Sequence, residues 1–569
     1  MNQRYWNIYP PISAEHTLRK YYPPLLAQLL HNRGITDLAQ AEAFIGLSSS
    51  GTYDPWNMNG IAKAVQRIQQ ALLRGELIAV YGDFDVDGIS ATVLLTKGIE
   101  RLGGKVLPYI PHRFLEGHGL NHTAVNMLAL SGVSLIISAD CGINGIEEGE
   151  CPTKPYHPQP DLIITDHHFP PSVLPKAHAM VNPKLHDSNY PHKDLSGVGV
   201  AYKLLQALYN GLGRENELDQ YLEMVALGTV ADMMPLVGEN RYLVKSGIQH
   251  LRDTKNIGLA ELASLSSIDL KKLDAQNISF GLAPRLNAAG RISHANSAFE
   301  LLTTTSSERA RTLAQEIIEQ NGERQRLTSS ALAHAKEQIM SEGERAVLFA
   351  HDSNYSRGII GLVAGKLCDE HNIPAVVVQT NDDICYGSAR SIPEFNITEA
   401  IANCSDLLTR YGGHDQAAGF SLPTKNLFVF RNRLEHIALG KLEKLARRQQ
   451  LDIDMVVPLS KMNHEVHSKM ERLAPFGIGN QTPVFLSRGV QITDCRSMGI
   501  NGSHLRLKLK QGAYYWDAVA FGMGERIDEV HALMDIVYNL ELNEWNGESK
   551  LRINLLDFAR DNSHEQNGE

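Results

Sequence analysis

The sequence predicts an α/β protein whose first domain is built on a parallel sheet, and three observations lead to that prediction. Apolar strand-like runs alternate with helical segments through the first half of the chain. Residues 308–341 then form one long stretch at helical spacing, which we expect to join this domain to a second α/β domain. After residue 453, short alternating strands separated by turns predict a small β-barrel of the OB-fold type.

The sheet opens with the apolar run Leu77–Tyr81, and an acidic corner follows directly. Asp83, Asp85 and Asp87 occupy alternate positions there, before a helix expected over Ser90–Leu102. Such strand-to-helix corners are where α/β sheets bind their ligands. Because carboxylates packed this closely repel one another, a hard cation such as Mg²⁺ or Mn²⁺ is their natural ligand. An acidic turn exposed to solvent would give the same pattern, so the other acids of the chain are needed to distinguish a metal site from such a turn.

Two further predicted strands end in polar residues of the same kind. Val133–Ala139 is followed by Asp140, Asp161–Thr165 is followed by Asp166–His168, and a later helical segment presents Asp232. Because the carboxyl ends of parallel strands meet at one edge of a sheet, we expect these side chains to share a site. Four carboxylates and one imidazole are about what two divalent cations need when one carboxylate bridges them.

Changes of texture along the chain predict its domain boundaries. The N-terminal segment carries short helices and no chemistry, and we expect it to cap the domain that follows. Thr305, with Glu308 three residues later, is the signature of a capping box at the start of the long helix. That helix would be on the order of 50 Å long, which is typical of a helix that links two lobes. The expected parts are a cap (1–60), the first α/β domain (61–304), the linker helix (305–344), the second α/β domain (345–450) and the barrel (453–560).

The second α/β domain is expected to carry two glycine-containing motifs. Gly387–Ser391 lies at the end of a predicted strand. Tyr411–Phe420 follows a helix predicted over residues 397–411 and is expected to form a loop. Its Gly412-Gly413 pair would either leave backbone N–H groups free for an anion or form a tight turn.

Composition and charge exclude several classes of protein. Apolar residues make up 43% and charged residues 21% of the chain, as in ordinary globular proteins. No apolar run is long enough to cross a bilayer and no signal peptide is evident, so we expect no membrane association. The 6 cysteines lack Cys-x-x-Cys spacing, which predicts reduced thiols in a cytoplasmic protein. The formal charge is 54 − 64 = −10, so any nucleic-acid site must be local and carry its own arginines.

Taken together, these motifs resemble those of the DHH phosphoesterase superfamily. Asp-x-Asp-x-Asp-Gly at 83–88, Ala-Asp-Cys-Gly at 139–142, Asp-His-His at 166–168 and Gly-Thr-Val-Ala-Asp at 228–232 stand in the expected order. Within the superfamily, the chain is most similar to bacterial single-strand-specific 5′→3′ DNA exonucleases, in which a long helix joins a DHH domain to a DHHA1 domain and an OB-fold follows. The resemblance runs from about residue 60 to 560 and includes Pro111–Arg113, Glu116–Gly119, Ala283–Arg291 and the Gly-Gly-His stretch.

The resemblance implies roles for the acids and histidines. The ligands of two Mn²⁺ or Mg²⁺ ions would be Asp85, Asp87, Asp140, His167 and Asp232. Asp140 would bridge the ions, Asp83 would be a weaker ligand, and Asp166 would orient an imidazole. His168 would lie beside the scissile phosphate and stabilise charge or assist proton transfer, while a metal-activated water attacks phosphorus in line.

It also implies a set of phosphate-binding residues: Arg113, Arg285, Asn287, Arg291, Ser388, Arg390 and His414. A guanidinium can contact two phosphate oxygens at once, although a surface ion pair is the ordinary alternative for any single arginine. Ser388, Arg390 and His414 would form the wall opposite the metals. In the barrel, Tyr514–Trp516 and the neighbouring basic residues suit stacking on single strands, or else belong to its core.

Two positions depart from the family pattern. A proline-rich crossover at 145–160 replaces a more helical segment. His118 stands where a tyrosine is more usual, which would alter contacts to the end of the strand.

The resemblance implies metal-dependent degradation of single-stranded DNA to mononucleotides in DNA repair and recombination. The chain would act as a monomer, with a single-strand-binding protein and a helicase as partners. One alternative is a phosphodiesterase of short RNA or cyclic dinucleotides, which needs neither the long helix nor the barrel; the same objection applies to a pyrophosphatase. Another is a non-catalytic scaffold of a replication complex, against which the complete set of ligand positions counts.

Overall fold

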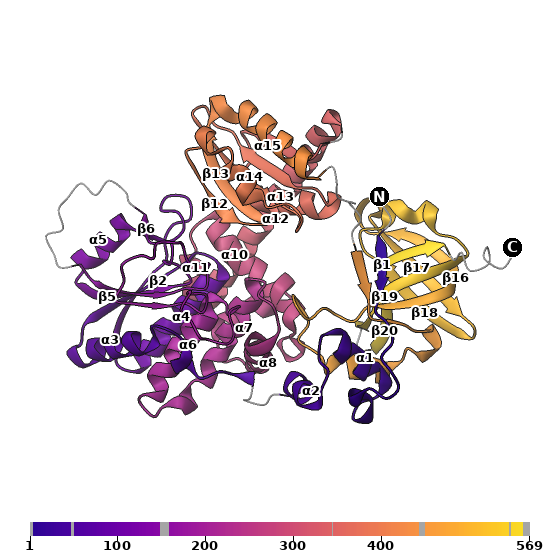
Figure 1. The fold of residues 1–569 in the computed structure, drawn as a ribbon, viewed down its shortest axis with the longest axis horizontal. Coiled ribbons are helices and arrows are strands. Elements are labelled where there is room, and N and C mark those ends of the chain that lie inside the picture. The colour runs from indigo at the N-terminus through magenta and orange to yellow at the C-terminus, as the bar shows by residue number, and fades with distance from the viewer. Residues whose placement is uncertain are drawn as a thin grey trace. The chain divides into compact units, whose positions relative to one another are not determined.

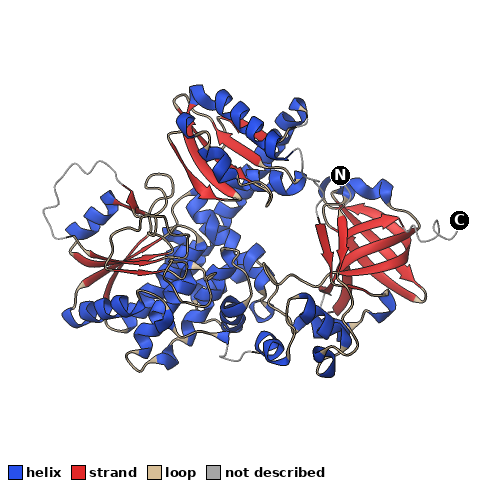
Figure 2. Ribbon diagram, viewed as in Figure 1, coloured by secondary structure: helices blue, strands red, loops and turns tan. Residues whose placement is uncertain are grey.

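The computed structural model describes residues 4–46, 51–147, 159–343, 345–442, 450–545 and 548–560. The chain divides into two compact units. The sheet unit contains Asp54–Asp232 and Gly247–Arg447, and the barrel unit contains Met1–Tyr53, Met233–Ser246 and Arg448–Glu569. Helices and strands alternate in the sheet unit, whereas long strands dominate the barrel unit (Figure 2). None of the helices in the described ranges combines the length and hydropathy that crossing a bilayer requires.

A five-stranded parallel sheet forms the base of the sheet unit, which confirms the prediction (Figure 1). Its strands, in spatial order, are β3 (Lys105–Tyr109), β2 (Leu77–Gly82), β5 (Val133–Ala139), β7 (Asp161–Thr165) and β8 (Ala179–Val181). The strand order reverses between β2 and β5, because β3 pairs with one side of β2 and all later strands add on the other. The carboxyl ends of two strands that flank such a reversal border a crevice, and ligands of α/β sheets bind there.

Helix α4 (Val86–Arg101) follows β2 and packs against α6 (Gly197–Asn210) and α7 (Leu222–Ala231). It begins at Val86 rather than at the predicted Ser90. The reason is a cap: the Asp85 carboxylate accepts hydrogen bonds from the N–H groups of Asp87 (3.0 Å) and Gly88 (3.1 Å). The acidic corner is therefore the N-terminus of the helix, where the helix dipole favours negative charge.

The predicted long helix is α12 (Ser307–Glu342), which runs for 36 residues. Its cap is Ser306, whose hydroxyl accepts a hydrogen bond from the Arg309 N–H (3.3 Å), so the predicted capping box starting at Thr305 is wrong by one residue. Helices α9 (Ile257–Leu265), α10 (Ala283–Ile292) and α11 (Asn296–Thr303) pack against it. Further along, Ala331 and Ala335 join the core of the second lobe. The helix therefore links two lobes, as expected.

The second lobe contains a mixed sheet in the order β12 (Arg410–His414), β13 (Ala417–Pro423), β11 (Ile384–Arg390), β10 (Ala375–Gln379) and β9 (Leu348–Asp352). Only β9 and β10 are parallel. Helices α13 (Ile360–His371), α14 (Ile397–Ala402) and α15 (Leu427–Leu442) accompany it.

The predictions for residues 397–420 are partly wrong. The helix expected over 397–411 ends at Ala402, and the Gly-Gly pair lies on the edge strand β12 rather than in a loop or a tight turn. The reason is the antiparallel pairing with β13, in which Gly412 lies opposite Gly419. Gly413 must be a glycine there, because a Cβ would collide with the carbonyl oxygen of Ala417.

The barrel unit contains the predicted closed barrel of five strands. They are β16 (Phe485–Met498), β17 (His504–Gln511), β18 (Tyr514–Ala520), β20 (Glu548–Arg560) and β19 (Leu533–Trp545), and β19 pairs back with β16. Strand β16 pairs with both β19 and β17, because β-bulges near Val490 and Asp494 bend it from one strand towards the other.

Residues 4–46 belong to the barrel unit, so the prediction that they cap the first α/β domain is wrong. Strand β1 (Tyr5–Ile8) pairs in parallel with β14 (Gln450–Ile453). Helix α1 (Pro24–Asn32) buries its leucines in the same core as Leu507 and Tyr538 of the barrel. Helix α2 (Leu38–Ile45) adds Ala41 to that core.

The predicted first domain is also interrupted, because residues 233–246 join the barrel unit. They include the start of α8 (Gly238–Arg252). The Arg241 guanidinium donates hydrogen bonds to the carbonyl oxygens of Ala474 (2.8 Å) and Pro475 (3.3 Å) and lies over the Phe44 ring. Most of the proline-rich crossover predicted at 145–160 lies outside the described residues.

Candidate active site

Asp83, Asp85 and Asp87 lie at the carboxyl end of β2, where the strand order reverses. Asp83 is 2% exposed and Asp87 is 1% exposed. The Asp87 carboxylate accepts hydrogen bonds from the N–H groups of Gly197 (2.6 Å) and Val198 (2.9 Å), the first residues of α6. One carboxylate therefore joins the N-termini of α4 and α6 and keeps lone pairs for a cation.

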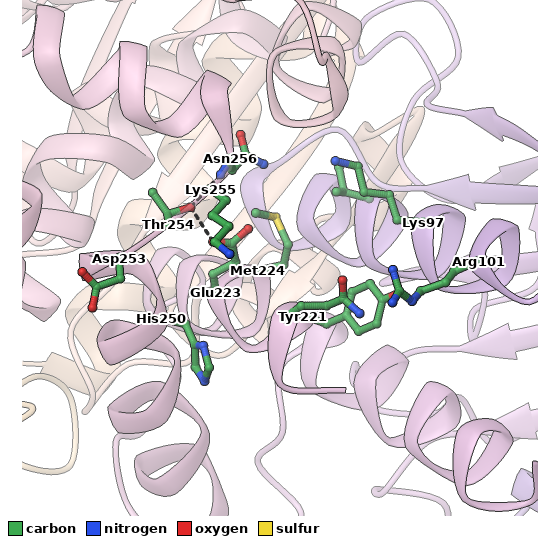
Figure 3. A pocket seen from close by; sticks show the side chains of 12 residues that line it. Lys97, Arg101, Tyr221, Glu223, Met224, His250, Asp253, Thr254, Lys255 and Asn256 are labelled. Carbon is green, nitrogen blue, oxygen red and sulfur yellow. Dashed lines mark hydrogen bonds between the residues drawn. The ribbon is translucent and has the colours of Figure 1, made fainter. Parts of the chain in front are cut away.

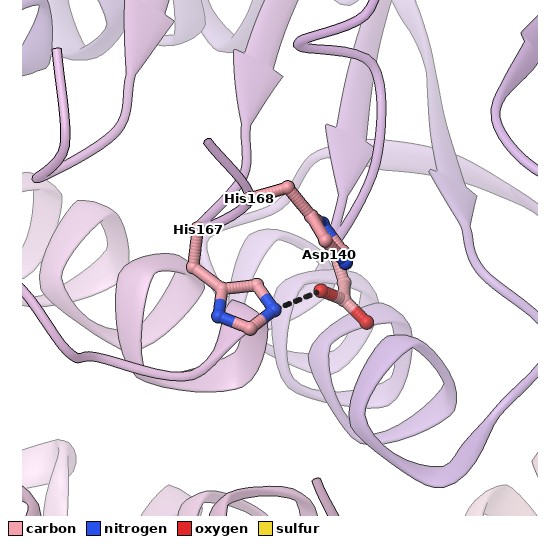
Figure 4. A group of neighbouring side chains, drawn as sticks. All are labelled: Asp140, His167 and His168. Carbon is pink, nitrogen blue, oxygen red and sulfur yellow. Dashed lines mark ion pairs between the residues drawn. The ribbon is translucent and has the colours of Figure 1, made fainter. Parts of the chain in front are cut away.

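Asp140 follows β5, on the other side of the reversal from Asp83. Its backbone has a φ of 64°, in the left-handed region that aspartate enters more readily than most residues. The buried side chain lies so close to Gly197 that a Cβ there would collide with the carboxylate. Its Oδ1 lies 3.1 Å from Nε2 of His167 (Figure 4).

Asp166, His167 and His168 follow β7, and Asp166 is the residue that holds the group in place. Its carboxylate accepts hydrogen bonds from the N–H groups of Ile143 (2.9 Å), His167 (2.7 Å) and His168 (3.1 Å), and lies 2.7 Å from Nδ1 of the His168 ring. Burial alone would raise the pKa of Asp166, but the hydrogen bond and the charge of His168 hold this pKa well below its usual range. Burial lowers the pKa of His168, but the same hydrogen bond and the charges of Asp166, Asp232 and Asp83 together outweigh burial and raise that pKa to about 9. Asp166 therefore orients the imidazole of His168.

His167 lies between two acids from different elements. Its Nε2 is 3.1 Å from Asp140 Oδ1 and 3.6 Å from Oδ2 of Asp232, the residue that ends α7. Burial lowers the pKa of His167 to about 3, so the ring is in the neutral form that a metal ligand requires. Gly228, one turn before Asp232, allows α7 to approach, because a Cβ there would lie 2.7 Å from Asp87 Oδ1.

Atoms of these side chains converge in three overlapping groups, and within each group one ligand atom per residue lies within 4.8 Å of the others. The groups are Asp83, Asp85 and Asp140; Asp87, His167 and Asp232; and Asp140, His167 and His168. Asp140 and His167 each belong to two groups, which suits ligands shared between two ions or lying between them.

The site carries more negative charge than its own residues can neutralise. Burial, and then the charge of neighbouring carboxylates, raises the pKa of Asp83, Asp140 and Asp232, and raises that of Asp87 to about 7. Within the described ranges, Asp83 Oδ1 is buried without a hydrogen-bond partner, and Asp140 Oδ1 has only the nearby His167 Nε2, 3.1 Å away. Unpaired buried polar atoms are costly, and divalent cations would satisfy them and the repelling carboxylates together. The residues present therefore fit two divalent cations.

A second cluster, of arginines, lies in the same unit. Burial lowers the pKa of Arg113, Arg324 and Arg390, and lowers that of Arg291 to about 9. The charges of Arg113, Arg324 and Arg390 lower the Arg291 pKa further. Arg285, in turn, lowers the pKa of Arg324.

The hydrogen bonds of these arginines go to neutral groups. Arg285 donates to the Gly281 carbonyl, Arg291 to the Gly358 carbonyl, and Arg390 to the Ala389 carbonyl and the Ser388 hydroxyl. The Arg113 guanidinium lies 4.5 Å from the centre of the Phe84 ring. In the part of the chain that the structure describes, none of the five has an ion pair with a carboxylate. A bound anion would therefore compensate the charge of the arginine cluster, as divalent cations would compensate the charge of the acidic cluster.

The structure places the remaining predicted residues as follows. The side-chain oxygen of Asn287 accepts a hydrogen bond from the Val86 N–H (3.2 Å), so this residue holds the start of α4. The His414 ring, on the second lobe, stacks on the His168 ring with centroids 6.0 Å apart. His118 also reaches the site, with its Nε2 3.7 Å from Asp83 Oδ2.

Sequence reasoning missed several residues of this site: Phe84, Gly197, Val198, Gly228 and Arg324. The one available signal was Ser196 before Gly197, the residue pattern of a helix cap. Nothing in the sequence indicated that the new helix would donate its first N–H groups to Asp87.

A separate cavity of about 560 Å³, whose lining side chains are drawn in Figure 3, lies at the C-terminal end of α4 and the N-terminal end of α7. Its lining includes Lys97, Arg101, Tyr221, Glu223 and Lys255. It contains no residue of either cluster, so it does not contribute to the chemistry at the acidic edge.

An acidic sheet edge that requires divalent cations, beside arginines that require anions, is the chemistry of a metal-dependent phosphoesterase. The Asp-His-His triplet at the end of β7 makes it one of the DHH class. Three family descriptions match the chain: the N-terminal domain of the DHH family at 77–229, the DHHA1 domain at 344–439 and the RecJ OB domain at 453–557.

Relatives agree with this class over most of the chain. It is 36% identical over 548 residues to the single-stranded-DNA-specific exonuclease RecJ of Bacillus subtilis, covering 95% of this chain and 69% of that protein. It is 30% identical to RecJ of Salmonella typhimurium, covering 94% and 96% of the two chains. The crystal structure of RecJ from Thermus thermophilus in complex with Mn²⁺ matches with a TM-score of 0.80 at 26% identity, covering 98% of this chain and 79% of that one. The chain belongs to the RecJ family.

Proposed function

We propose that the chain is a single-stranded-DNA-specific exonuclease that removes mononucleotides in the 5′→3′ direction. The observation that carries the proposal is the presence, in one unit, of a cluster of buried carboxylates that raise one another's pKa and a cluster of arginines whose hydrogen bonds go to neutral groups. A strand of linked phosphates with two metal ions would satisfy both clusters at once. The relatives named above support the choice of substrate, since they are single-stranded-DNA-specific exonucleases.

Two Mn²⁺ or Mg²⁺ ions would be held by Asp85, Asp87, Asp140, His167 and Asp232. Asp140 would be the shared ligand, because its carboxylate is grouped with Asp83 and Asp85 and also with the two histidines. Asp83 is a stronger candidate than its sequence position suggested, since it is buried and grouped with Asp85 and Asp140. When bound, the ions would activate a water for in-line attack and neutralise charge that develops on the phosphoryl oxygens.

His168 would face the scissile phosphate while Asp166 fixes the orientation of its ring. The Asp166 carboxylate beside Nδ1 leaves Nε2 to donate a hydrogen bond to a phosphoryl oxygen or to pass a proton to the leaving oxygen. The raised pKa of His168 keeps the ring protonated near neutral pH, which suits either task.

Within the arginine cluster, Arg113, Arg285, Arg291 and Arg390 would hold the 5′ end of the strand. Arg113 and Arg291 are nearest the acids, since the charges of Asp83 or Asp85 act on each of them. Arg390, with the Ser388 hydroxyl bound to it, would complete a pocket for the terminal phosphate. His414 would contribute from the second lobe through its stacking on His168, and Asn287 would act indirectly by holding α4.

The barrel would contact the rest of the strand. Tyr514 and Tyr515 are exposed, and Lys510 lies 5.4 Å from the centre of the Tyr515 ring. Trp516 packs against the barrel core instead, so of these three neighbouring aromatic residues the two tyrosines offer stacking faces for bases.

The biological setting follows from this activity. We propose a role in DNA repair and recombination, with a single-strand-binding protein and a helicase supplying the single strand, and a monomeric enzyme. The described cysteines are all free thiols, which supports action in the reducing cytoplasm.

One experiment tests the proposal. Single strands labelled at the 5′ or the 3′ end, a duplex and a cyclic dinucleotide are incubated with the protein and Mn²⁺ or EDTA. We expect mononucleotides from the 5′ end of single strands, in Mn²⁺ only. Release from the 3′ end, cleavage of the cyclic dinucleotide alone, or full activity in EDTA would refute it.

A further inference from the structure

A cavity of about 330 Å³ opens beside Arg390, between the linker helix α12 and helix α13 of the second lobe. Apart from Arg390, its polar lining comes from α12, with Arg324, Gln325, Thr328 and Ser329, and from α13, with Lys366 and Asp369. The volume lies near the lower end of the range of small-ligand sites, about 300–1,000 Å³. The cavity is therefore large enough for a small anionic group.

The charge of this cavity is positive. Three cationic side chains, Arg324, Lys366 and Arg390, line it against one acid, Asp369. The Nε of Arg324 is buried without a hydrogen-bond partner among the described residues. Burial, and then the charge of Arg285, lowers the pKa of Arg324, so its guanidinium is poorly compensated. An anion in the cavity would supply the missing partner.

The cavity begins where the proposed site for the 5′-phosphate ends. Arg390 contributes to the phosphate site and also lines the cavity. Its Nη1 donates a hydrogen bond to the Ser388 hydroxyl. Besides burial, the charge of Arg113, in the phosphate site, lowers the pKa of Arg390, and that of Asp369, in the cavity, raises it. Gly361 keeps the junction open, because a Cβ there would lie 3.2 Å from Arg390 Nη2 and 3.0 Å from Ser388 Oγ. An anion that extends past Arg390 would therefore enter the cavity.

We propose that this cavity takes the outer phosphates of a strand that begins with a 5′-triphosphate, so that the enzyme degrades triphosphate-ended strands as well as monophosphate-ended ones. The inference rests on the proposed function. A single terminal phosphate is already matched by Arg113, Arg291 and Arg390, which leaves Arg324 and Lys366 without an anion. Two further phosphates in line with the first would occupy this space.

The reaction at such an end needs no additional reagent. Water attacks the phosphorus between the first and second nucleotides, and the bond from that phosphorus to the 3′ oxygen breaks. The 3′ oxygen leaves with a proton as the hydroxyl of the first nucleotide, which is released as an intact nucleoside 5′-triphosphate. The remaining strand begins with a 5′-phosphate and continues as an ordinary substrate.

The test uses one single strand with a 5′-hydroxyl, a 5′-monophosphate or a 5′-triphosphate, the full-length protein and Mn²⁺. Products are identified by liquid chromatography and mass spectrometry. We expect the triphosphate strand to be degraded and its first nucleotide to appear as the nucleoside triphosphate.

Variants locate the effect. Arg324→Gln and Lys366→Gln should each lower the ratio of kcat/KM for the triphosphate strand to that for the monophosphate strand by about tenfold, the loss expected for one charge-assisted hydrogen bond. The control is Arg311→Gln, an exposed arginine on the same helix that does not line the cavity. It should leave the ratio unchanged. Thermal unfolding of each variant checks that it is folded.

The outcomes separate the inference from the proposed function. If the monophosphate strand is degraded and the triphosphate strand is not, or is first trimmed to pyrophosphate and a monophosphate end, the inference is wrong and the function stands. Equal losses on both strands in the folded Arg324→Gln and Lys366→Gln variants would also refute it. If neither strand is degraded from its 5′ end, both proposals fail.

Discussion

The acidic and arginine clusters of the sheet unit are both gatherings of like charge, but they are held in different ways. The acids are short side chains, and three of them, Asp85, Asp87 and Asp166, are fixed by backbone N–H groups, such as those of Gly197 and Val198 that bind Asp87. The arginines have long side chains from separate helices and strands, and their hydrogen bonds go to a few carbonyl oxygens and one hydroxyl.

This difference suggests a division of work. Side chains locked by the backbone preserve one geometry, which metal ions and in-line attack require. Long cationic side chains adapt to a ligand and lose conformational freedom only when it arrives. We therefore expect changes in the acidic cluster to lower kcat and changes in the arginine cluster to raise KM.

The largest effect is expected from Asp140→Asn. The substitution keeps the volume of the side chain but removes the charge of the proposed shared ligand, so kcat should fall by more than about 10³-fold. Release of mononucleotides from a labelled single strand in Mn²⁺ measures it. Asp382→Asn, an exposed acid of the second lobe, is the matched control. A turnover within tenfold of the unchanged protein would rule out Asp140 as the bridge.

Asp166→Asn should have a smaller effect, because Asp166 acts through His168 and not on a metal ion. Losing the partner of a functional imidazole lowers activity by about 10–100-fold. The pKa of His168, which this hydrogen bond helps to raise to about 9, should fall, so the alkaline limb of the pH–kcat profile should move to lower pH. An unchanged profile would mean that His168 takes no part in the rate-limiting step.

The acidic cluster could be predicted from the pattern of its own residues, whereas four of the five arginines are expected only from the family resemblance and the fifth, Arg324, is not predicted at all. Asp140 and Asp166, the residue before His167, directly follow apolar runs that are typical of buried strands, so their position at one sheet edge follows from parallel pairing. Arg324 looks like any other arginine of a solvated helix face, and only the packing of α13 gives it a cavity to line. A local pattern records which element a residue belongs to, but not which distant element packs against it.

The N-terminal segment illustrates the same limit. The leucines of α1 indicate a buried face, yet nothing in their spacing distinguishes the sheet unit from the barrel as the partner. The packing of the N-terminal segment on the barrel depends on strand β14, more than 400 residues later, with which β1 pairs. Such long-range pairing is set by the shape of the whole unit.

Arg390→Lys tests whether the arginine cluster acts on substrate binding rather than on the chemical step. Lysine keeps the charge but loses the fork that can bind two phosphate oxygens, so KM for a 5′-monophosphate strand should rise about tenfold while kcat changes little. The same variant should affect a 5′-hydroxyl strand much less, since that end has no phosphate to bind. A loss confined to kcat would place Arg390 with the chemistry instead and would break the proposed division.

The smallest effect we predict is on stability, and it depends on the raised pKa values of the acids. A carboxyl whose pKa is higher in the folded than in the unfolded protein favours folding while it is protonated, and that contribution is lost as the pH rises through the raised value, about 7 for Asp87. Metal binding requires the deprotonated form, so at lower pH the ions must displace protons. Mn²⁺ should therefore raise the unfolding temperature more at about pH 8 than at about pH 6.

Calorimetric scans with Mn²⁺ or EDTA at both pH values measure this difference. With the free ion at about 100 times its Kd, binding to one site stabilises a protein by about 2.7 kcal/mol. The Asp140→Asn variant should lose most of the Mn²⁺ effect at both pH values, whereas Arg390→Lys should keep it, because the arginine binds the anion and not the cation. An equal stabilisation at both pH values would show that the acids are already ionised without metal, and a loss of Mn²⁺ stabilisation in Arg390→Lys would show that the two clusters do not act separately.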